Sequence, residues 1–327
     1  MRSTKMFIAA LGATALVLTG CASGASDPAE SDGGGDITVA FIPGIASDPF
    51  FRAMEIAAKD EAEKLGITLI WQGASDQYSP QTQLPFVDAA LAQDIDALVL
   101  VPTDADALQP SVTKAESMGI PVITVDTTVS DQSTLVSHIT GDNKDGGERA
   151  AAEMNEQIGG KGTVLVISAS PTNTTGTQRV AGFEETMKAE YSGIELLPVQ
   201  FAYSQPSEAT TILNTTLLEH PDLAGVFAVD GTSCTGAIAA LNNSNKVGEV
   251  SLICYDAYSS QVAELEEGSV SALIAQDPAQ EARLALQYAY AKITGEGEDQ
   301  IEKSVVIENV VMNRQNLAET RKYTYAE

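Results

Sequence analysis

Acidic and amide side chains end several of the β-rich runs in this 327-residue sequence. Asp126, Asp230 and Asp256 each close such a run, and Gln276 with Asp277 closes another. Carboxylate and amide oxygens accept hydrogen bonds from hydroxyl groups, so a cluster of them would suit a small hydroxylated ligand. Any one aspartate is better explained as the cap of the next helix. For the set we favour a ligand crevice, because ligands of open parallel sheets bind beyond the carboxyl ends of the strands.

The segment ASDPFF, residues 46–51, follows the first β-rich run and joins a carboxylate to two aromatic rings. In one interpretation Asp48 caps a helix that begins at Pro49, and both rings enter the core. In the other, Asp48 accepts protons from ligand hydroxyls, and Phe50 or Phe51 covers an apolar face of the same ligand. The segment alone does not separate the two.

The elements that must position these residues alternate between β-rich runs and amphipathic helical segments from Ile37 onward. This alternation is typical of βαβ units and a mainly parallel sheet. The runs outnumber the strands of one ordinary doubly wound sheet, so we expect an α/β protein with two Rossmann-like doubly wound lobes. The expected strands are 37–43, 67–73, 97–102, 121–126, 163–168, 195–201, 225–230, 251–256 and 272–277, and examples of the expected helices are 50–65, 104–118, 143–158, 178–190 and 278–294.

The formal net charge of −27 argues against partners that are themselves anionic. An acidic surface repels nucleic acid and anionic lipid, which excludes a typical DNA-binding regulator. Two cysteines, Cys234 and Cys254, lie in the body of the sequence. They could form a disulfide outside the cytoplasm or remain two small buried thiols.

The first residues are typical of an export signal. Arg2 and Lys5 precede an apolar run over 6–18, which is too short to span a bilayer as a mature helix. The run ends in Leu-Thr-Gly-Cys, which resembles the lipobox of bacterial lipoproteins. That resemblance implies that residues 1–20 are a signal peptide and that Cys21 carries a lipid anchor. Residues 21–36, rich in Gly, Ser, Ala and Asp, are expected to form a flexible linker.

An enzyme is the rival to a binding protein. The sequence has no G-x-G-x-x-G after its first strand, no G-x-x-x-x-G-K-[ST] and no G-x-S-x-G. Asp126 and Asp256 could in principle act as the carboxylate pair of a glycoside hydrolase, or could simply accept hydroxyl protons. His138 and His220 have no neighbours in the sequence that suggest a metal site or a catalytic triad.

An ordered series of motifs resembles the ribose- and galactose-type periplasmic sugar-binding proteins of ABC importers. The series is DPFF, LVLVPTDADAL, GIPVITVD, VSHITGDN, RVAGF, HPDLAGVFAVD, ICYDA and ALIAQDP. The resemblance implies a periplasmic binding protein type I fold, with two lobes joined by three hinge strands that close on a sugar. It places one lobe at 37–141 plus 277–307 and the other at 142–276 plus 308–327.

The resemblance also assigns ligand contacts to individual positions. It implies hydroxyl acceptors at the aspartates and the hinge glutamine, a donor at the arginine of RVAGF, and aromatic rings on both sides of the sugar. The second-lobe ring is assigned to Tyr203, although a shift of one residue would replace it with Ser204. The predicted ligand-binding set is Asp48, Phe50, Phe51, Asp126, Thr127, Arg179, Tyr203, Asp230, Tyr255, Asp256 and Gln276.

Departures from the family pattern bear on the ligand. Thr127 stands where ribose binders have an arginine, and Asp48 and Asp230 stand where Asn also occurs. Four aspartates against Arg179 predict a neutral or cationic ligand, either a sugar, a polyol or an amino sugar. The resemblance further implies an ABC permease as partner, a monomer, no catalysis, and neither cofactor nor metal. A sensory receptor of the same fold is the alternative to import.

Overall fold

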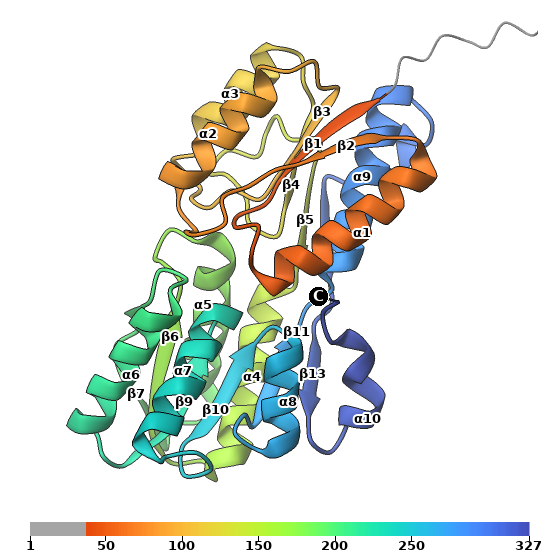
Figure 1. Ribbon diagram of the computed structural model, residues 1–327. Coiled ribbons are helices and arrows are strands. Elements are labelled where there is room, and N and C mark those ends of the chain that lie inside the picture. The colour runs from red at the N-terminus through yellow and green to blue at the C-terminus, as the bar shows by residue number, and fades with distance from the viewer. Residues whose placement is uncertain (1–36, 327) are drawn as a thin grey trace, which may run out of the picture. The chain divides into compact units, whose positions relative to one another are not determined.

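The strands form two separate sheets, each carried by its own lobe (Figure 1). The structure, a computed structural model, describes residues 37–326. The expected signal peptide, the lipid attachment at Cys21 and the linker therefore lie outside the described residues.

The first lobe is built on a six-stranded sheet in which every strand pair is parallel. Its strand order is β12-β5-β4-β3-β1-β2. The strands are β1 (Thr38–Ile42), β2 (Thr68–Trp71), β3 (Ala97–Leu100), β4 (Val122–Val125), β5 (Ser137–Gly141) and β12 (Ser304–Ile307), and the helices are α1 (Pro49–Leu65), α2 (Pro80–Leu91), α3 (Gln109–Ser117), α9 (Pro278–Thr294) and η1 (Glu298–Gln300).

The second lobe repeats this plan around the order β13-β11-β10-β9-β6-β7, with β8 paired to β6. Its pairs are parallel except for β11 with β13. The strands are β6 (Gly162–Ser168), β7 (Ile194–Leu196), β8 (Gln200–Phe201), β9 (Leu223–Ala228), β10 (Ser251–Tyr255), β11 (Ala272–Ala275) and β13 (Val310–Asn313), and the helices are α4 (Asn143–Ile158), α5 (Thr174–Glu190), α6 (Pro206–Glu219), α7 (Gly231–Ser244), α8 (Ser259–Glu267), α10 (Leu317–Thr320) and η2 (Arg321–Tyr323).

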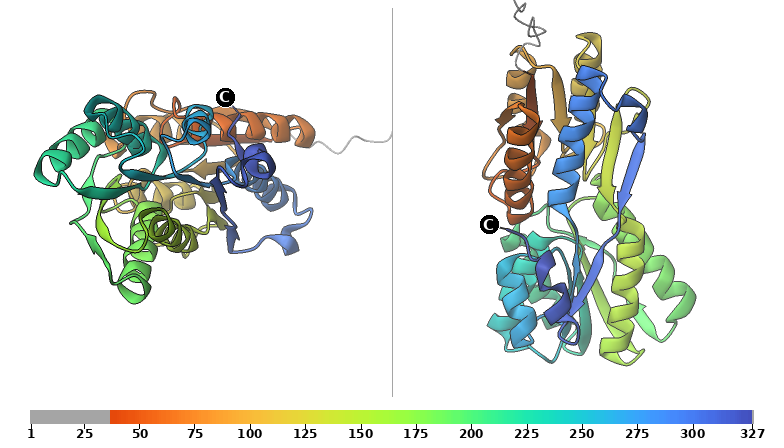
Figure 2. Two further views of the ribbon diagram at one scale, coloured as in Figure 1. Left: turned by 90° about the horizontal axis from the view of Figure 1, so that it is seen from below. Right: turned by 90° about the vertical axis from the view of Figure 1, so that its right-hand side faces the viewer.

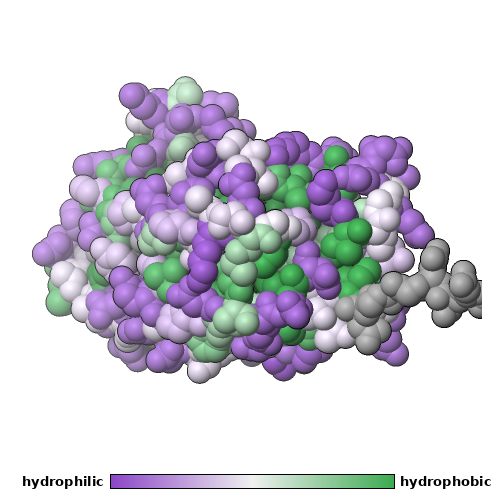
Figure 3. Space-filling view, turned by 90° about the horizontal axis from the view of Figure 1, so that it is seen from above, coloured by the Kyte–Doolittle hydropathy of each residue, from purple (hydrophilic) through white to green (hydrophobic). Residues whose placement is uncertain are grey.

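Burial on both faces explains the continuous apolar runs of the central strands. All four residues of β3, ALVL, and of β4, VITV, are buried. Helices cover both faces of each sheet, as the two views in Figure 2 show. A sheet covered on both sides needs apolar residues at successive positions, whereas a half-exposed sheet would alternate. The outer end of the first lobe carries apolar patches separated by polar side chains (Figure 3).

The chain passes between the two sheets three times. The passages follow β5, β11 and β12, at Asp142, Gln276–Asp277 and Glu308–Asn309 respectively. Asn309 joins two of them, because its Nδ2 donates to the carbonyl of Asp142 at 2.7 Å. A Cβ at Gly141 would lie 3.1 Å from Asn309 and 3.2 Å from Gln276, so the three passages run close together. These close passages bring the carboxyl ends of both sheets towards each other.

Several details differ from the sequence-based expectations. The strands β5, β12 and β13 were not among the expected strands, and the run 195–201 contains two short strands, β7 and β8. The helix expected over 104–118 begins only at Gln109, next to Pro110. Of the two alternatives for Cys234 and Cys254, the structure contains the disulfide, which joins α7 to β10.

Candidate functional site

A cavity lies between the two lobes, at the carboxyl ends of both parallel sheets. Loops and helix starts of the first lobe form one wall and those of the second lobe form the other. The lining residues are Ile45, Asp48, Phe50, Phe51, Tyr78, Asp126, Ala169, Asn173, Thr175, Gly176, Arg179, Ser204, Val229, Asp230, Gly231, Thr232, Asp256, Tyr258 and Gln276.

Asp126 and Asp256 enter the cavity from equivalent places in the two lobes. Asp126 follows β4 and Asp256 follows β10. Both have left-handed backbone conformations, with φ of 59° and 77°, which non-glycine residues adopt at a cost of about 1–3 kcal/mol. Their amides still donate to the neighbouring strand, at Ile139 and Ile274. The chain therefore turns sharply at each strand end and directs a carboxylate to the cavity.

Asp256 is held by three donors of the protein. Its Oδ1 accepts from Gln276 Nε2 at 2.8 Å and from the hydroxyl of Tyr325 at 3.0 Å. Its Oδ2 accepts from the amide of Gly231 at 2.8 Å. Asp256 is 4 % exposed, so these bonds replace the water that its carboxylate loses on burial.

Arg179, on α5, is a buried cation at the centre of the site. Its Nε donates to Asn143 Oδ1 at 2.7 Å, its Nη1 to the carbonyl of Val229 at 3.1 Å, and its Nη2 to Gln276 Oε1 at 2.8 Å. The guanidinium lies 3.7 Å from the centroid of the Tyr255 ring. These bonds fix the orientation of the cation towards Asp126, whose Oδ1 lies 3.8 Å from Nη2 across the cavity.

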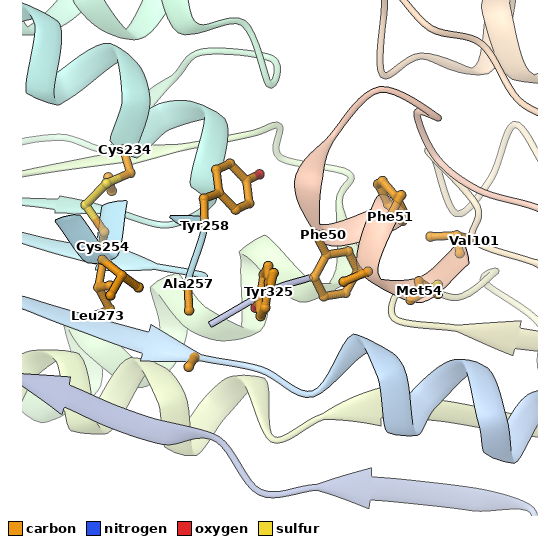
Figure 4. Close-up of a cluster of buried hydrophobic side chains, with 14 of the residues drawn as sticks. Phe50, Phe51, Met54, Val101, Cys234, Cys254, Ala257, Tyr258, Leu273 and Tyr325 are labelled. Carbon is orange, nitrogen blue, oxygen red and sulfur yellow. A yellow bond between two sulfur atoms is a disulfide. The ribbon is translucent and has the colours of Figure 1, made fainter. Parts of the chain in front are cut away.

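Asp48 both caps a helix and faces the opposite lobe. Its Oδ1 accepts from the amide of Phe50 at 2.8 Å, and Pro49 occupies the first turn of α1. Its Oδ2 accepts from the hydroxyl of Tyr258, in the second lobe, at 2.8 Å. Figure 4 shows the ring of Phe50 between Phe51 and the second-lobe residues. The interpretation of ASDPFF as a helix cap with two buried rings is therefore confirmed, and the same three residues also line the cavity.

A second contact between the lobes involves Tyr78. Its ring stacks on Phe51, with 6.5 Å between centroids and 19° between planes. Its hydroxyl accepts from Asn173 Nδ2, in the second lobe, at 3.2 Å. Tyr78 thus gives the first-lobe wall a further aromatic face and a hydroxyl partner.

Burial raises the pKa values of three carboxyl groups at this site above the ordinary value for aspartate. Burial, with a contribution from the charge of Asp256, raises the pKa of Asp48 from 3.8 to about 7. Burial also raises the pKa of Asp126 to about 7, although the nearby Arg179 opposes the change. The pKa of Asp256 is raised by burial, and its donors work in the opposite direction. Groups that titrate near neutral pH in a cleft are typical of binding and catalytic sites.

Eight of the eleven predicted ligand residues line this cavity: Asp48, Phe50, Phe51, Asp126, Arg179, Asp230, Asp256 and Gln276. Three do not. Thr127 is buried and is not among the lining residues, and it donates its hydroxyl to the carbonyl of Pro102. Tyr255 lies fully buried beneath Arg179. Tyr203 is 60 % exposed, and the adjacent Ser204 lines the cavity instead.

Other residues at the site were not predicted. Tyr78, Asn173 and Tyr258 line the cavity, and Tyr325 bonds to Asp256 behind it. The N-cap position of Asn173, whose Oδ1 accepts from the amide of Gly176 at 2.7 Å, is a signal that the sequence carries. The tyrosines stand in loops or at helix ends, where no periodic pattern indicates which way a ring points.

Within residues 37–326, no group of three or more His, Cys, Asp or Glu side chains is arranged to hold a metal ion. Over the same residues, no helix has the length and apolar character needed to cross a bilayer.

Comparison with known proteins identifies the class. A family model described as "Periplasmic binding protein domain" matches residues 39–297. The chain therefore belongs to the periplasmic binding protein family, and its two parallel-sheet lobes are the type I fold of that family. The proteins to which it is similar include a ribose import binding protein, a D-ribose/D-allose-binding protein and an ABC transporter solute-binding protein.

Three similar proteins illustrate this family membership. The chain is 28% identical over 262 residues to the ribose import binding protein RbsB of Bacillus subtilis, covering 80% of this chain and 83% of that one. It is 27% identical over 290 residues to the xylitol-binding protein of Mycolicibacterium smegmatis, covering 88% and 80%. An ABC transporter solute-binding protein from Agrobacterium vitis, solved with bound α-D-tagatopyranose, is 33% identical with a TM-score of 0.85, covering 89% of this chain and 100% of that one.

Proposed function

We propose that this protein captures a small neutral or cationic sugar or polyol in the cavity between its lobes and delivers it to an ABC importer. The observation that carries the proposal is the set of acceptors, donor and rings that both lobes direct into one cavity. Asp126 Oδ1 is buried there without a hydrogen-bond partner in the protein. A buried carboxylate oxygen without a partner is costly, so a ligand hydroxyl or ammonium would supply the missing donor.

The residue types suit a polyhydroxylated ligand. Hydroxyl groups donate to the carboxylates, and an Arg fork donates to ring or hydroxyl oxygens. The rings of Phe50 and Phe51 offer flat apolar faces to the C–H face of a sugar. Relatives named for ribose, allose, apiose and xylitol support this ligand class.

The charges that line the cavity narrow the class of ligand further. Four aspartates, Asp48, Asp126, Asp230 and Asp256, share the cavity with Arg179. Three donor groups of Arg179 are already bonded within the protein. A sugar acid or sugar phosphate would therefore place its anion beside carboxylates, so we propose that such ligands are excluded.

A thermal-shift screen over D-ribose, D-allose, D-tagatose, D-arabinose, xylitol, D-glucosamine, D-gluconate and D-ribose 5-phosphate tests the proposal. A ligand at a thousand times its Kd stabilises the folded protein by about 4 kcal/mol. We expect a neutral or amino member to raise Tm and the two anions to have no effect. Calorimetry on the hits gives Kd. Tight binding of an anion would refute the charge argument, and no shift with any sugar or polyol would refute the function.

Capture is proposed to proceed by closure, in which a ligand bonded to both lobes favours the closed arrangement. The permease would then recognise that arrangement, with the binding protein acting as a monomer. A sensory role would use the same cavity, but relatives are named for the import of ribose and of D-apiose. Turnover of a glycoside, followed by NMR, would instead indicate an enzyme.

We also propose that the mature protein is lipid-anchored through Cys21. The support is the lipobox-like Leu-Thr-Gly-Cys after an apolar run. Expression of wild type and Cys21→Ser in a bacterial host, followed by membrane fractionation and mass spectrometry of the mature N-terminal peptide, tests this. A diacylglyceryl mass on Cys21, lost with membrane association in the variant, is expected. An unmodified Cys21 would contradict the proposal.

A further inference from the structure

The segment that follows η2 returns to the back of the ligand cavity. Its Tyr325 is 4 % exposed, and the amide of Tyr325 donates to the carbonyl of Ala257 at 2.9 Å. The Tyr325 ring lies between the lobes, 5.8 Å from the Phe50 ring centroid and 6.1 Å from that of Tyr258. Figure 4 shows this ring between Ala257 and Phe50. One side chain therefore contacts residues from both lobes.

The hydroxyl of Tyr325 connects two parts of the site. It donates to Asp256 Oδ1 at 3.0 Å and accepts from the backbone amide of Gln276 at 3.2 Å. Asp256 lines the cavity, and Gln276 stands where the chain passes from β11 towards α9. Tyr325 itself is not among the lining residues. Its hydroxyl thus acts on the site only through the groups that it bonds.

The bonds around Asp256 show what that hydroxyl determines. Gly231 fixes Oδ2 through one bond, and Gln276 Nε2 and Tyr325 share Oδ1. Gln276 in turn accepts from Arg179 through its Oε1. The amide and the carboxylate that face the cavity are therefore oriented by one connected network. A network that is complete before binding lowers the ordering cost that a ligand must offset.

We propose that Tyr325 is a positioning residue for ligand binding, whose hydroxyl holds Asp256 and the hinge residue Gln276 in their ligand-bonding orientation. The inference rests on the function proposed above. A role in packing alone would require only the ring, because phenylalanine would fill the same space between Phe50 and Tyr258. The two hydrogen bonds of the hydroxyl indicate a role beyond that space.

Tyr325→Phe in the full chain tests the proposal, with Tyr323→Phe as the matched control. Tyr323 stands two residues earlier, and its half-buried ring faces Lys322 rather than the cavity. For whichever of D-ribose, D-allose, D-tagatose, D-arabinose, xylitol and D-glucosamine binds wild type, we expect Tyr325→Phe to weaken Kd about tenfold. The control variant should bind as wild type does. An unchanged Kd in Tyr325→Phe would overturn the proposal.

The pH profile of Kd distinguishes positioning from packing. The bond from Tyr325 favours the ionised form of Asp256, so its loss raises the pKa of that carboxyl. The pH below which affinity declines should therefore move upwards in Tyr325→Phe and stay in place in Tyr323→Phe. A weakened Kd without this movement would indicate general loosening and would count against the proposal.

A ligand-independent measurement separates failure of this inference from failure of the proposed function. If none of the six compounds binds wild type, the proposed function fails. A pH titration followed by NMR at the carboxyl carbon of Asp256 then gives the pKa of that group in wild type and in both variants. This measurement tests the contact between Tyr325 and Asp256 without any ligand. An upward movement of its titration in Tyr325→Phe supports control by Tyr325, and identical titrations overturn it.

Discussion

Asp126 and Asp256 occupy equivalent positions in the two lobes but have opposite relations to the protein. Each follows a central parallel strand, each has positive φ, and each amide donates to the adjacent strand. Asp256 accepts three hydrogen bonds from protein groups, whereas Asp126 Oδ1 is buried without any. The repeated backbone thus presents one anchored carboxylate and one available carboxylate.

This difference indicates that the two lobes contribute different kinds of acceptor to the site. The second lobe holds a preassembled network of Asp256, Gln276 and Arg179. The first lobe offers Asp126, whose charged neighbour Arg179 approaches only to 3.8 Å. A ligand that bonds both carboxylates would connect the lobes, because the available acceptor and the fixed network belong to different ones. A ligand that bonds both lobes at once favours the closed arrangement of the protein.

Loss of Arg179 is expected to have the largest effect. Arg179→Met keeps an apolar stem but leaves Asn143 and Gln276 without their donor and removes the cation from buried Asp126 and Asp256. Removing one partner of a buried ionic network costs about 3–5 kcal/mol. Urea unfolding of the ligand-free protein measures this. Arg149→Met is the control, since its ion pair with Asp145 is partly exposed. A loss below about 1 kcal/mol would show that the network is not anchored by Arg179.

Asp256→Asn is expected to have the next largest effect on the ligand-free protein. The amide can still accept at its oxygen, but its NH2 group would face donors of the present network. We expect a loss of about 1–3 kcal/mol in unfolding free energy, together with weaker sugar binding. Urea unfolding and calorimetry give the two values. Unchanged stability would mean that the three bonds do not distinguish Asp256 from Asp126.

Much of this arrangement could be predicted from the sequence. The alternation of apolar runs and helical segments indicated two parallel sheets, and the polar residues at strand ends indicated the cavity. β12 was missed because its apolar run, VVI, is only three residues long and lies in a half-exposed strand at the edge of the sheet. The direction of a side chain in a loop was not predictable either. Tyr203 and Ser204 both have φ of 52°, and this local backbone exposes the ring and turns Ser204 inwards.

The difference in hydrogen bonding between Asp126 and Asp256 also could not be predicted from the sequence. Asp256 is anchored by Tyr325 and Gln276, which are 69 and 20 residues away along the chain. Such bonds depend on how the passages between lobes pack, which no local pattern encodes. By contrast, the cap at Asp48 depends on the adjacent Pro49 and Phe50, and was among the interpretations that the segment itself suggested.

Asp126→Asn is expected to separate binding from stability. Since Asp126 Oδ1 has no hydrogen bond to lose, the unfolding free energy of the ligand-free protein should fall by less than about 0.5 kcal/mol or should rise. Sugar affinity measured above pH 7, where Asp126 is ionised, should weaken about tenfold, because a charged acceptor is then replaced by a neutral one. Calorimetry and urea unfolding on the same preparation test both. Equal losses of stability in Asp126→Asn and Asp256→Asn would remove the contrast between the lobes.

The sign of the pH dependence of stability follows from the raised pKa values of two carboxyl groups at the site. Asp48 and Asp126 have pKa values of about 7 in the folded protein against 3.8 as the ordinary value. Between about pH 4 and pH 7 the folded state therefore binds protons that the unfolded state has released. The contribution of these groups to stability is fully present below about pH 4 and is lost as the pH rises through 7.

Asp126→Asn removes one of these two titrations, so its unfolding free energy should decline less steeply between pH 5 and pH 7 than that of wild type. Asp94→Asn, at an exposed position, is the control for loss of one negative charge at the surface. Urea unfolding at intervals of half a pH unit gives the slopes. A slope in Asp126→Asn as steep as in wild type would mean that Asp126 ionises normally in the ligand-free protein. In that case the available carboxylate would be solvated rather than buried, and the first lobe would lack the unpaired acceptor that distinguishes it from the second.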